Sequence, residues 1–200
     1  MKLSRFVHSP RITLTDAIKD LTRLATLERT LGLVCIFIPF ILILFDGLHI
    51  RNSISAYYSM SRDQVFYFSL SVAAMLFIVN GVVKEKHIYN TILGIMLSGV
   101  ILFNCDAVPI VHFSCASVFF GGNGFVILFF SSKKERSFKI IFTAIIVVAM
   151  LGCFLFHWFS LFWAEWISLA IIAIHYFIEA SYTENVQIQG RIIKTIDSAA

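Results

Sequence analysis

Six continuous apolar stretches, each close to the length that an α-helix needs to cross a lipid bilayer, take up most of this chain. Their approximate bounds are 31–48, 65–83, 88–105, 108–130, 139–156 and 159–180. Inside a membrane only helices and closed barrels satisfy their own backbone hydrogen bonds, and a barrel strand would alternate apolar and polar residues. The sequence therefore predicts an all-α membrane protein, a six-transmembrane-helix bundle.

The composition argues against a soluble globular domain. Hydrophobic residues make up 58% of the chain and charged residues 14%, whereas a soluble domain carries about a quarter charged residues. The connections between the stretches are short, so we expect one bundle. Residues 31–180 form this transmembrane domain, residues 1–30 precede it, and residues 181–200 follow it as a tail.

The segment before the first span has the pattern of an amphipathic helix. Between residues 13 and 31, leucine, isoleucine and alanine recur at helical spacing, with Lys19, Arg23 and Arg29 among them. This helix would either lie on the membrane surface or extend the first span. The sequence leaves both alternatives open.

The basic residues fall almost entirely on one side of the predicted bundle. Every Lys and Arg except Arg51 and Arg62 lies in the N-terminal segment, the second-third connection, the fourth-fifth connection or the tail. The positive-inside rule then places both termini in the cytoplasm. The net charge of +4 follows from this topology, so we predict the lipid bilayer as a partner and no nucleic acid. The oligomeric state is left open.

Polar and ionisable residues collect on the opposite, extracytoplasmic side. Ionisable groups in a membrane are costly and usually functional, so we expect a polar pocket that binds a lipid or a small molecule. The alternative is an interfacial rim of separate residues with an aromatic belt. The candidate ligand-binding residues are Ser53, Ser55, Tyr57, Tyr58, Arg62, Asp63, Asp106, His112, His157 and Glu165.

The last span carries a second polar pattern. Ser168, His175 and Glu179 follow Glu165 at spacings that place all four on one helical face. Such a stripe would line a water-filled path or a proton relay. The alternative, which we favour, is that the two glutamates lie near opposite interfaces and His175 is a packed residue.

Small residues predict where helices pack closely. Gly94 with Ser98, and Ser117 with Gly121, form pairs with small-xxx-small spacing. A glycine-rich run at residues 121–124 would loosen or kink the fourth span, although a packing role is our preferred interpretation. The four cysteines have no paired spacing, so we predict no metal site and no cofactor.

Three motifs occur in a characteristic order: SIS-x-YY at residues 53–58, His112-Phe113, and FW-x-E at residues 162–165. In this order they resemble an uncharacterised family of six-helix bacterial integral membrane proteins, over about residues 29–180. The resemblance implies the fold, the topology and a bacterial inner (plasma) membrane location, and it brings no established activity. The topology is also distantly similar to the DRAM-like family, by analogy alone.

Three functions are compatible with these features. Binding of a lipid or small ligand at the extracytoplasmic pocket, without catalysis, ranks first. The second is a metal-dependent intramembrane lipid hydrolase similar to alkaline ceramidases, although the chain lacks their paired histidines on one helix, and Glu165 would have to act as ligand or base. Its residues would be Ser53 or Ser55, Asp106, His49, His112 and His157. The third is a transporter or channel that uses the polar face of the sixth helix.

Overall fold

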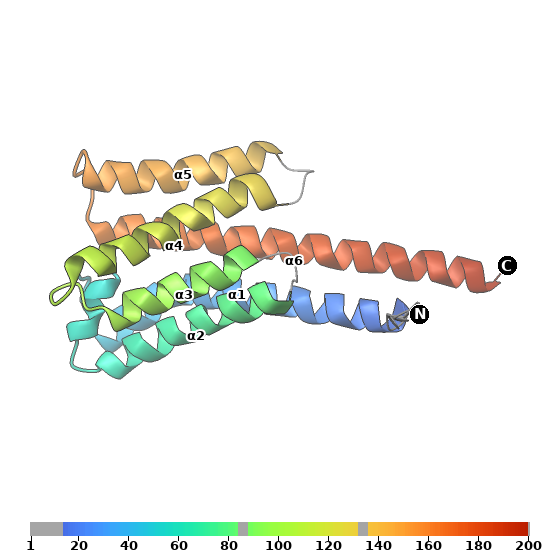
Figure 1. Ribbon diagram of the computed structural model, residues 1–200, viewed down its shortest axis with the longest axis horizontal. Coiled ribbons are helices and arrows are strands. Elements are labelled where there is room, and N and C mark those ends of the chain that lie inside the picture. Colours follow the sequence, from blue (N-terminus) through green and yellow to red (C-terminus); the bar gives the residue numbers. More distant parts are fainter. Residues whose placement is uncertain (1–13, 84–87, 132–135, 200) are drawn as a thin grey trace, which may run out of the picture.

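The computed structural model describes residues 14–83, 88–131 and 136–199, and within them all regular secondary structure is helical (Figure 1). The helices are α1 Leu14–Phe45, the 3-10 helix η1 Ser55–Ser59, α2 Asp63–Val83, α3 Ile88–Leu102, α4 Pro109–Phe130, α5 Arg136–Phe154 and α6 Leu161–Ala199. The predicted all-α class is confirmed. Within the described ranges, five of the helices are long and apolar enough to cross a membrane.

The third predicted span is shorter than expected. Helix α3 has 15 residues, which at a rise of 1.5 Å per residue give about 22 Å, less than the roughly 30 Å of a hydrocarbon core. The predicted bound was residue 105, but the chain turns at Asn104, whose side-chain oxygen accepts a hydrogen bond of 2.7 Å from the Asp106 backbone N–H. The polar side chain of Asn104 therefore competes with the helix for its backbone donors.

The first helix begins well before its predicted membrane span, and the last helix ends well after its own. Helix α1 is continuous from Leu14 into the first predicted span, so the described part of the N-terminal segment is an extension of that span. Residues 1–13 lie outside the described residues. Helix α6 continues past the last predicted span, whose expected limit was residue 180, to Ala199. Arg29 and Glu184 form an ion pair of 2.5 Å between the two helices.

The bundle has two distinct ends. The start of α1 and the finish of α6 lie at one end, which we call the terminal end (Figure 1). The α1–α2, α3–α4 and α5–α6 connections lie at the opposite end, the loop end. Helix α6 packs against α1 on one side and α5 on the other, so it runs through the middle of the bundle. This position lets α6 bring its polar residues into contact with several helices.

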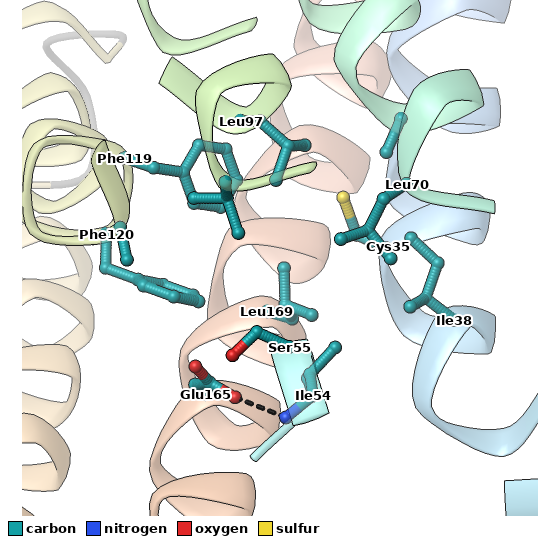
Figure 2. A pocket seen from close by; sticks show the side chains of 13 residues that line it. Cys35, Ile38, Ile54, Ser55, Leu70, Leu97, Phe119, Phe120, Glu165 and Leu169 are labelled. Carbon is teal, nitrogen blue, oxygen red and sulfur yellow. Dashed lines mark hydrogen bonds between the residues drawn. The ribbon is translucent and has the colours of Figure 1, made fainter. Parts of the chain in front are cut away.

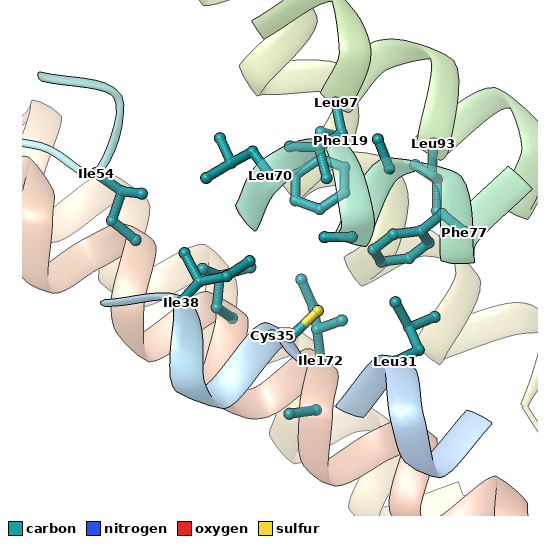
Figure 3. Close-up of a cluster of buried hydrophobic side chains, with 14 of the residues drawn as sticks. Leu31, Cys35, Ile38, Ile54, Leu70, Phe77, Leu93, Leu97, Phe119 and Ile172 are labelled. Atoms are coloured by element: carbon teal, nitrogen blue, oxygen red, sulfur yellow. The ribbon is translucent and has the colours of Figure 1, made fainter. Parts of the chain in front are cut away.

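The core lies between α1, α2, α3, α4 and α6, where Cys35, Leu70, Phe77, Phe119 and Ile172 are buried against one another (Figure 3). Phe77 meets Phe119 edge to face, with ring centroids 5.3 Å apart. The outer surface is also strongly apolar, with exposed aromatic and branched residues along every helix. A large exposed apolar surface of this kind suits a lipid environment.

Only one of the two predicted small-residue pairs marks a close helix contact. A Cβ at Gly94 would lie 2.6 Å from the Ala74 carbonyl oxygen, so α2 and α3 approach each other there as predicted. A Cβ at Gly121 would meet no atom within 4 Å, so Gly121 is not a packing residue. The glycine-rich run does not interrupt α4, which is continuous to Phe130.

Candidate functional site

The α1–α2 connection folds back over the loop end and contacts the start of α6. The backbone N–H of Phe162 donates a hydrogen bond of 2.7 Å to the Asn52 carbonyl. Tyr57 is fully buried, with its ring centroid 6.2 Å from that of Phe162. Its hydroxyl donates to the His49 carbonyl at 2.7 Å. Tyr57 therefore serves as the structural anchor of this connection.

Arg51 holds the connection in shape. Its guanidinium donates to both carboxylate oxygens of Asp46, at 2.6 and 3.0 Å, and also to the Ala56 carbonyl and the Ser59 hydroxyl, at 3.2 and 2.6 Å. The hydrogen bonds from Arg51 hold the pKa of the Asp46 carboxyl below its usual value. Asp46 was missed by the sequence analysis. The sequence feature that could have indicated this ion pair is the presence of a carboxylate five residues before Arg51. The intervening turn brings the two side chains together, and Gly47 in it has a φ of 69°.

Glu165 is the central residue of the site. Its side chain is 6% exposed, and its Oε2 accepts a hydrogen bond of 2.5 Å from the Ile54 backbone N–H (Figure 2). Ser55 points its hydroxyl toward the same carboxylate. The hydroxyl oxygens of Ser53 and Ser55 lie 3.1 Å apart. The structure thus brings together three of the predicted residues, Ser53, Ser55 and Glu165.

His112 lies in the first turns of α4 and is 3% exposed. Its Nδ1 is 2.7 Å from the Phe103 carbonyl oxygen. Because a carbonyl only accepts, Nδ1 carries the proton of this hydrogen bond. In the neutral ring, Nε2 is then a hydrogen-bond acceptor. This bond fixes the orientation of the imidazole.

A cavity of about 290 Å³ lies between α4, α5 and α6, and both His112 and Glu165 line it. The rest of its wall is apolar or small, for example Phe120, Met150 and Leu161. Among the described residues that line it, none is Lys or Arg. A smaller cavity of about 30 Å³ adjoins Glu165 on the core side and is shown in Figure 2. Glu165 therefore stands between the core and the larger cavity.

The remaining predicted ligand-binding residues do not join this cavity. The Tyr58 hydroxyl donates to the Asp106 carboxylate, which links the α1–α2 and α3–α4 connections. Arg62 is exposed and lies over the Phe45 ring, 5.8 Å from its centroid. Asp63 begins α2. His157 is exposed in the α5–α6 connection. The expected single cluster is thus divided between a buried part and a surface part.

The predicted stripe on α6 has mixed surroundings. Ser168 is buried and donates to the Ala164 carbonyl of its own helix at 2.8 Å. His175 and Glu179 line a separate cavity of about 10 Å³ near the terminal end. Glu179 accepts a hydrogen bond of 2.9 Å from the Ser131 hydroxyl. A cavity of this volume has room for about one water molecule, and it shares no lining residue with the cavity at Glu165.

A buried amide network, which was not predicted from the sequence, lies on the terminal-end side. The Asn90 side-chain amide donates to the Asn80 side-chain oxygen at 2.6 Å, and the Tyr176 hydroxyl donates to the Asn90 oxygen at 3.2 Å. Glu28 and Lys139 are also buried. The sequence feature that could have predicted this network is the presence of single polar residues inside otherwise apolar helices.

Within the ranges that the structure describes, no three or more His, Cys, Asp or Glu side chains are grouped so that they could hold a metal ion. The four cysteines are free thiols, and Cys35 and Cys153 are buried. What the site offers chemically is a buried carboxyl group and a buried imidazole, with the hydroxyl of Ser117 among the exposed lining residues, in an otherwise apolar cavity.

A family model described as a family of unknown function, DUF7103, matches residues 37–180. The match includes the α1–α2 connection, His112 and Glu165. No curated protein and no solved structure matches the chain. The predicted membership of an uncharacterised family is confirmed, whereas similarity to the DRAM-like family stays a prediction. Because the match covers more than half of the chain, this protein belongs to the family of unknown function DUF7103.

Proposed function

We propose that this protein is a multi-pass integral membrane protein that binds a lipid or another small amphiphilic molecule in the cavity between α4, α5 and α6. The observation that carries this proposal is the pair of buried ionisable side chains, His112 and Glu165, in a cavity of about 290 Å³ with otherwise apolar or small lining residues. Ligand sites are typically apolar cavities with a few fixed polar groups.

The shape of the cavity wall suits a ligand with a long apolar part. Phe113, Leu151 and Phe154 line the cavity and are themselves exposed at the surface of the bundle. A polar end held at His112 and Glu165 would leave an apolar chain free to extend between α4 and α5 into the bilayer. Burial of each methylene of such a chain contributes about 0.8 kcal/mol.

The basic residues support a defined orientation for this site. We place both termini in the cytoplasm, with six crossing helices, because nearly all Lys and Arg belong to the N-terminal segment, the second-third and fourth-fifth connections or the tail of the sequence. The cavity then lies in the extracytoplasmic half of a bacterial inner (plasma) membrane. The hydrolase and transporter alternatives stay predictions.

The proposed binding is tested by filling the cavity. Gly121 lines it and has open space around its Cβ position, so Gly121→Phe should occupy the cavity without disturbing His112 or Glu165. Gly121→Ala is the matched control. Native mass spectrometry of the detergent-purified protein should detect a bound amphiphile in wild type and in Gly121→Ala, and a loss of it in Gly121→Phe. Equal occupancy in a folded Gly121→Phe variant, or an empty wild type, would overturn the proposal.

The orientation is tested by labelling single cysteines in a cysteine-free background. Ser160 and Asn185 are exposed near the loop end and the terminal end, respectively. In intact cells, a membrane-impermeant maleimide should label Ser160→Cys. Asn185→Cys should react only after permeabilisation. The reverse pattern would show that the cavity faces the cytoplasm.

A further inference from the structure

We infer that the polar end of the ligand donates hydrogen bonds and carries no negative charge, as a hydroxyl or an ammonium group does. This inference rests on the proposed function, because it describes the ligand of the same cavity. It follows from the hydrogen-bonding atoms that the cavity presents and from the absence of cationic side chains among its lining residues.

Both buried polar groups of the cavity have acceptor atoms to offer, and the hydroxyl of the exposed lining residue Ser117 can accept as well. Glu165 uses one carboxylate oxygen for the Ile54 N–H, and a carboxylate has several further lone pairs on its two oxygens. His112 uses Nδ1 as a donor to Phe103, which leaves Nε2 as an acceptor in the neutral ring. A hydroxyl or ammonium group can donate to either acceptor.

An anionic head group would find no fixed cation in this cavity. None of its lining residues is Lys or Arg. Arg51, which is close in sequence to Ser53 and Ile54, is occupied by Asp46, Ala56 and Ser59. A carboxylate or phosphate buried beside Glu165 would lose its hydration without gaining a cationic partner, and the burial of an unpaired charge is strongly unfavourable.

The test compares three photoreactive probes that differ only in their polar end: diazirine-bearing hexadecanol, hexadecylamine and hexadecanoic acid. Each is irradiated with the full-length protein in liposomes of neutral phospholipid, and the labelled peptides are mapped by mass spectrometry. The alcohol and the amine should label the α4 segment 112–121 and the α5 segment 146–154. Labelling by the acid should be about tenfold weaker.

The outcomes separate this inference from the proposed function. If the acid labels these segments as strongly as the alcohol and the amine do, the inference is wrong and amphiphile binding stands. If none of the probes labels them above the level seen in Gly121→Phe, the proposed function itself is wrong. Competition by unlabelled hexadecanol confirms that labelling is specific.

A conservative variant tests the role assigned to Glu165. Glu165→Gln keeps an oxygen for the Ile54 N–H but replaces the other carboxyl oxygen, an acceptor, with an amide group that donates hydrogen bonds and can bind an acid head group. We expect the preference for alcohol over acid to fall at least severalfold in this variant. Glu184→Gln is the matched control, because Glu184 lies on the same helix and pairs with Arg29 near the terminal end. An unchanged preference in Glu165→Gln would also overturn the inference.

Discussion

The carboxylate of Glu165 accepts a hydrogen bond of 2.5 Å from the backbone N–H of Ile54, which lies 111 residues earlier in the chain. Together with the Asn52–Phe162 backbone hydrogen bond, this contact fixes the α1–α2 connection on the start of α6. The same carboxylate also lines the cavity between α4, α5 and α6. One buried side chain therefore couples the fold of the loop end to the candidate binding site.

Removal of the Glu165 carboxylate should release the α1–α2 connection. Glu165→Ala leaves the buried Ile54 N–H without its acceptor, which should lower the free energy of unfolding by about 1–3 kcal/mol. Glu165→Gln retains an acceptor oxygen and should lose less. Amide hydrogen exchange at Ile54, measured in detergent micelles, should accelerate in the alanine variant and stay slow in the glutamine variant. Slow exchange in both variants would contradict this role of Glu165.

The Asp46–Arg51 ion pair should make stability depend on pH. The hydrogen bonds from Arg51 lower the Asp46 pKa below its usual value of 3.8. The ionised carboxylate therefore stabilises the folded state above about pH 4, and this contribution is lost as the pH falls below that value. Asp46→Asn should unfold at a lower temperature than wild type at neutral pH, and the difference should shrink as the pH is lowered through the depressed pKa of the folded state. A difference that does not vary with pH would contradict the prediction.

The Tyr58–Asp106 contact should be visible in a tyrosine titration. The hydrogen bond that the Tyr58 hydroxyl donates to Asp106 raises the Tyr58 pKa above its usual value of 10.0. Because the neutral phenol is the bonded form, the contact persists below pH 10 and is lost as the pH rises further. The difference in ultraviolet absorbance between wild type and Tyr58→Phe should show a transition above pH 10. Asp106→Asn should move that transition to lower pH.

The helices were predictable because apolar length and charge distribution are local properties of the sequence. The predicted start of the first span, Leu31, falls within α1. The predicted end of the fourth span, Phe130, is the last residue of α4. The early end of α3 was not predicted, because the mean hydropathy stays high up to residue 105 although the chain turns at Asn104. The extension of α1 was one of two alternatives, and the choice depends on packing against α6.

The site was predictable only in part. His112 and Glu165 stood out as ionisable residues in apolar helices, and both line the same cavity. The division of the expected cluster depends on side-chain directions, which follow from tertiary packing rather than from composition. Asp106 pairs with Tyr58 instead of joining Glu165. Asp46 and Asn80 escaped notice because their partners depend on a turn and on a contact between two helices.

The contrast between two glycines should separate helix packing from cavity lining. Gly94→Ala places a Cβ 2.6 Å from the Ala74 carbonyl oxygen on α2, so the helices must move apart at a cost of about 1–3 kcal/mol. Gly121→Ala meets no atom within 4 Å, and its better helix propensity should stabilise α4 by up to about 1 kcal/mol. The unfolding temperature in detergent should therefore fall for Gly94→Ala and rise or stay level for Gly121→Ala. Equal destabilisation would contradict the packing assignment.

The amide network between α2, α3 and α6 should contribute more than its individual bonds. Asn90 donates to Asn80 and accepts from Tyr176, so Asn90→Ala removes a partner from both residues at once. Each buried polar group left without a partner costs about 1–3 kcal/mol. Tyr176→Phe removes one donor and leaves the Asn80–Asn90 bond in place, so it should cost less. A double-mutant cycle of these two substitutions should show a coupling energy of about 0.5 kcal/mol or more. Additive losses would mean that the Tyr176–Asn90 hydrogen bond does not contribute to stability, because residues in one network are expected to couple.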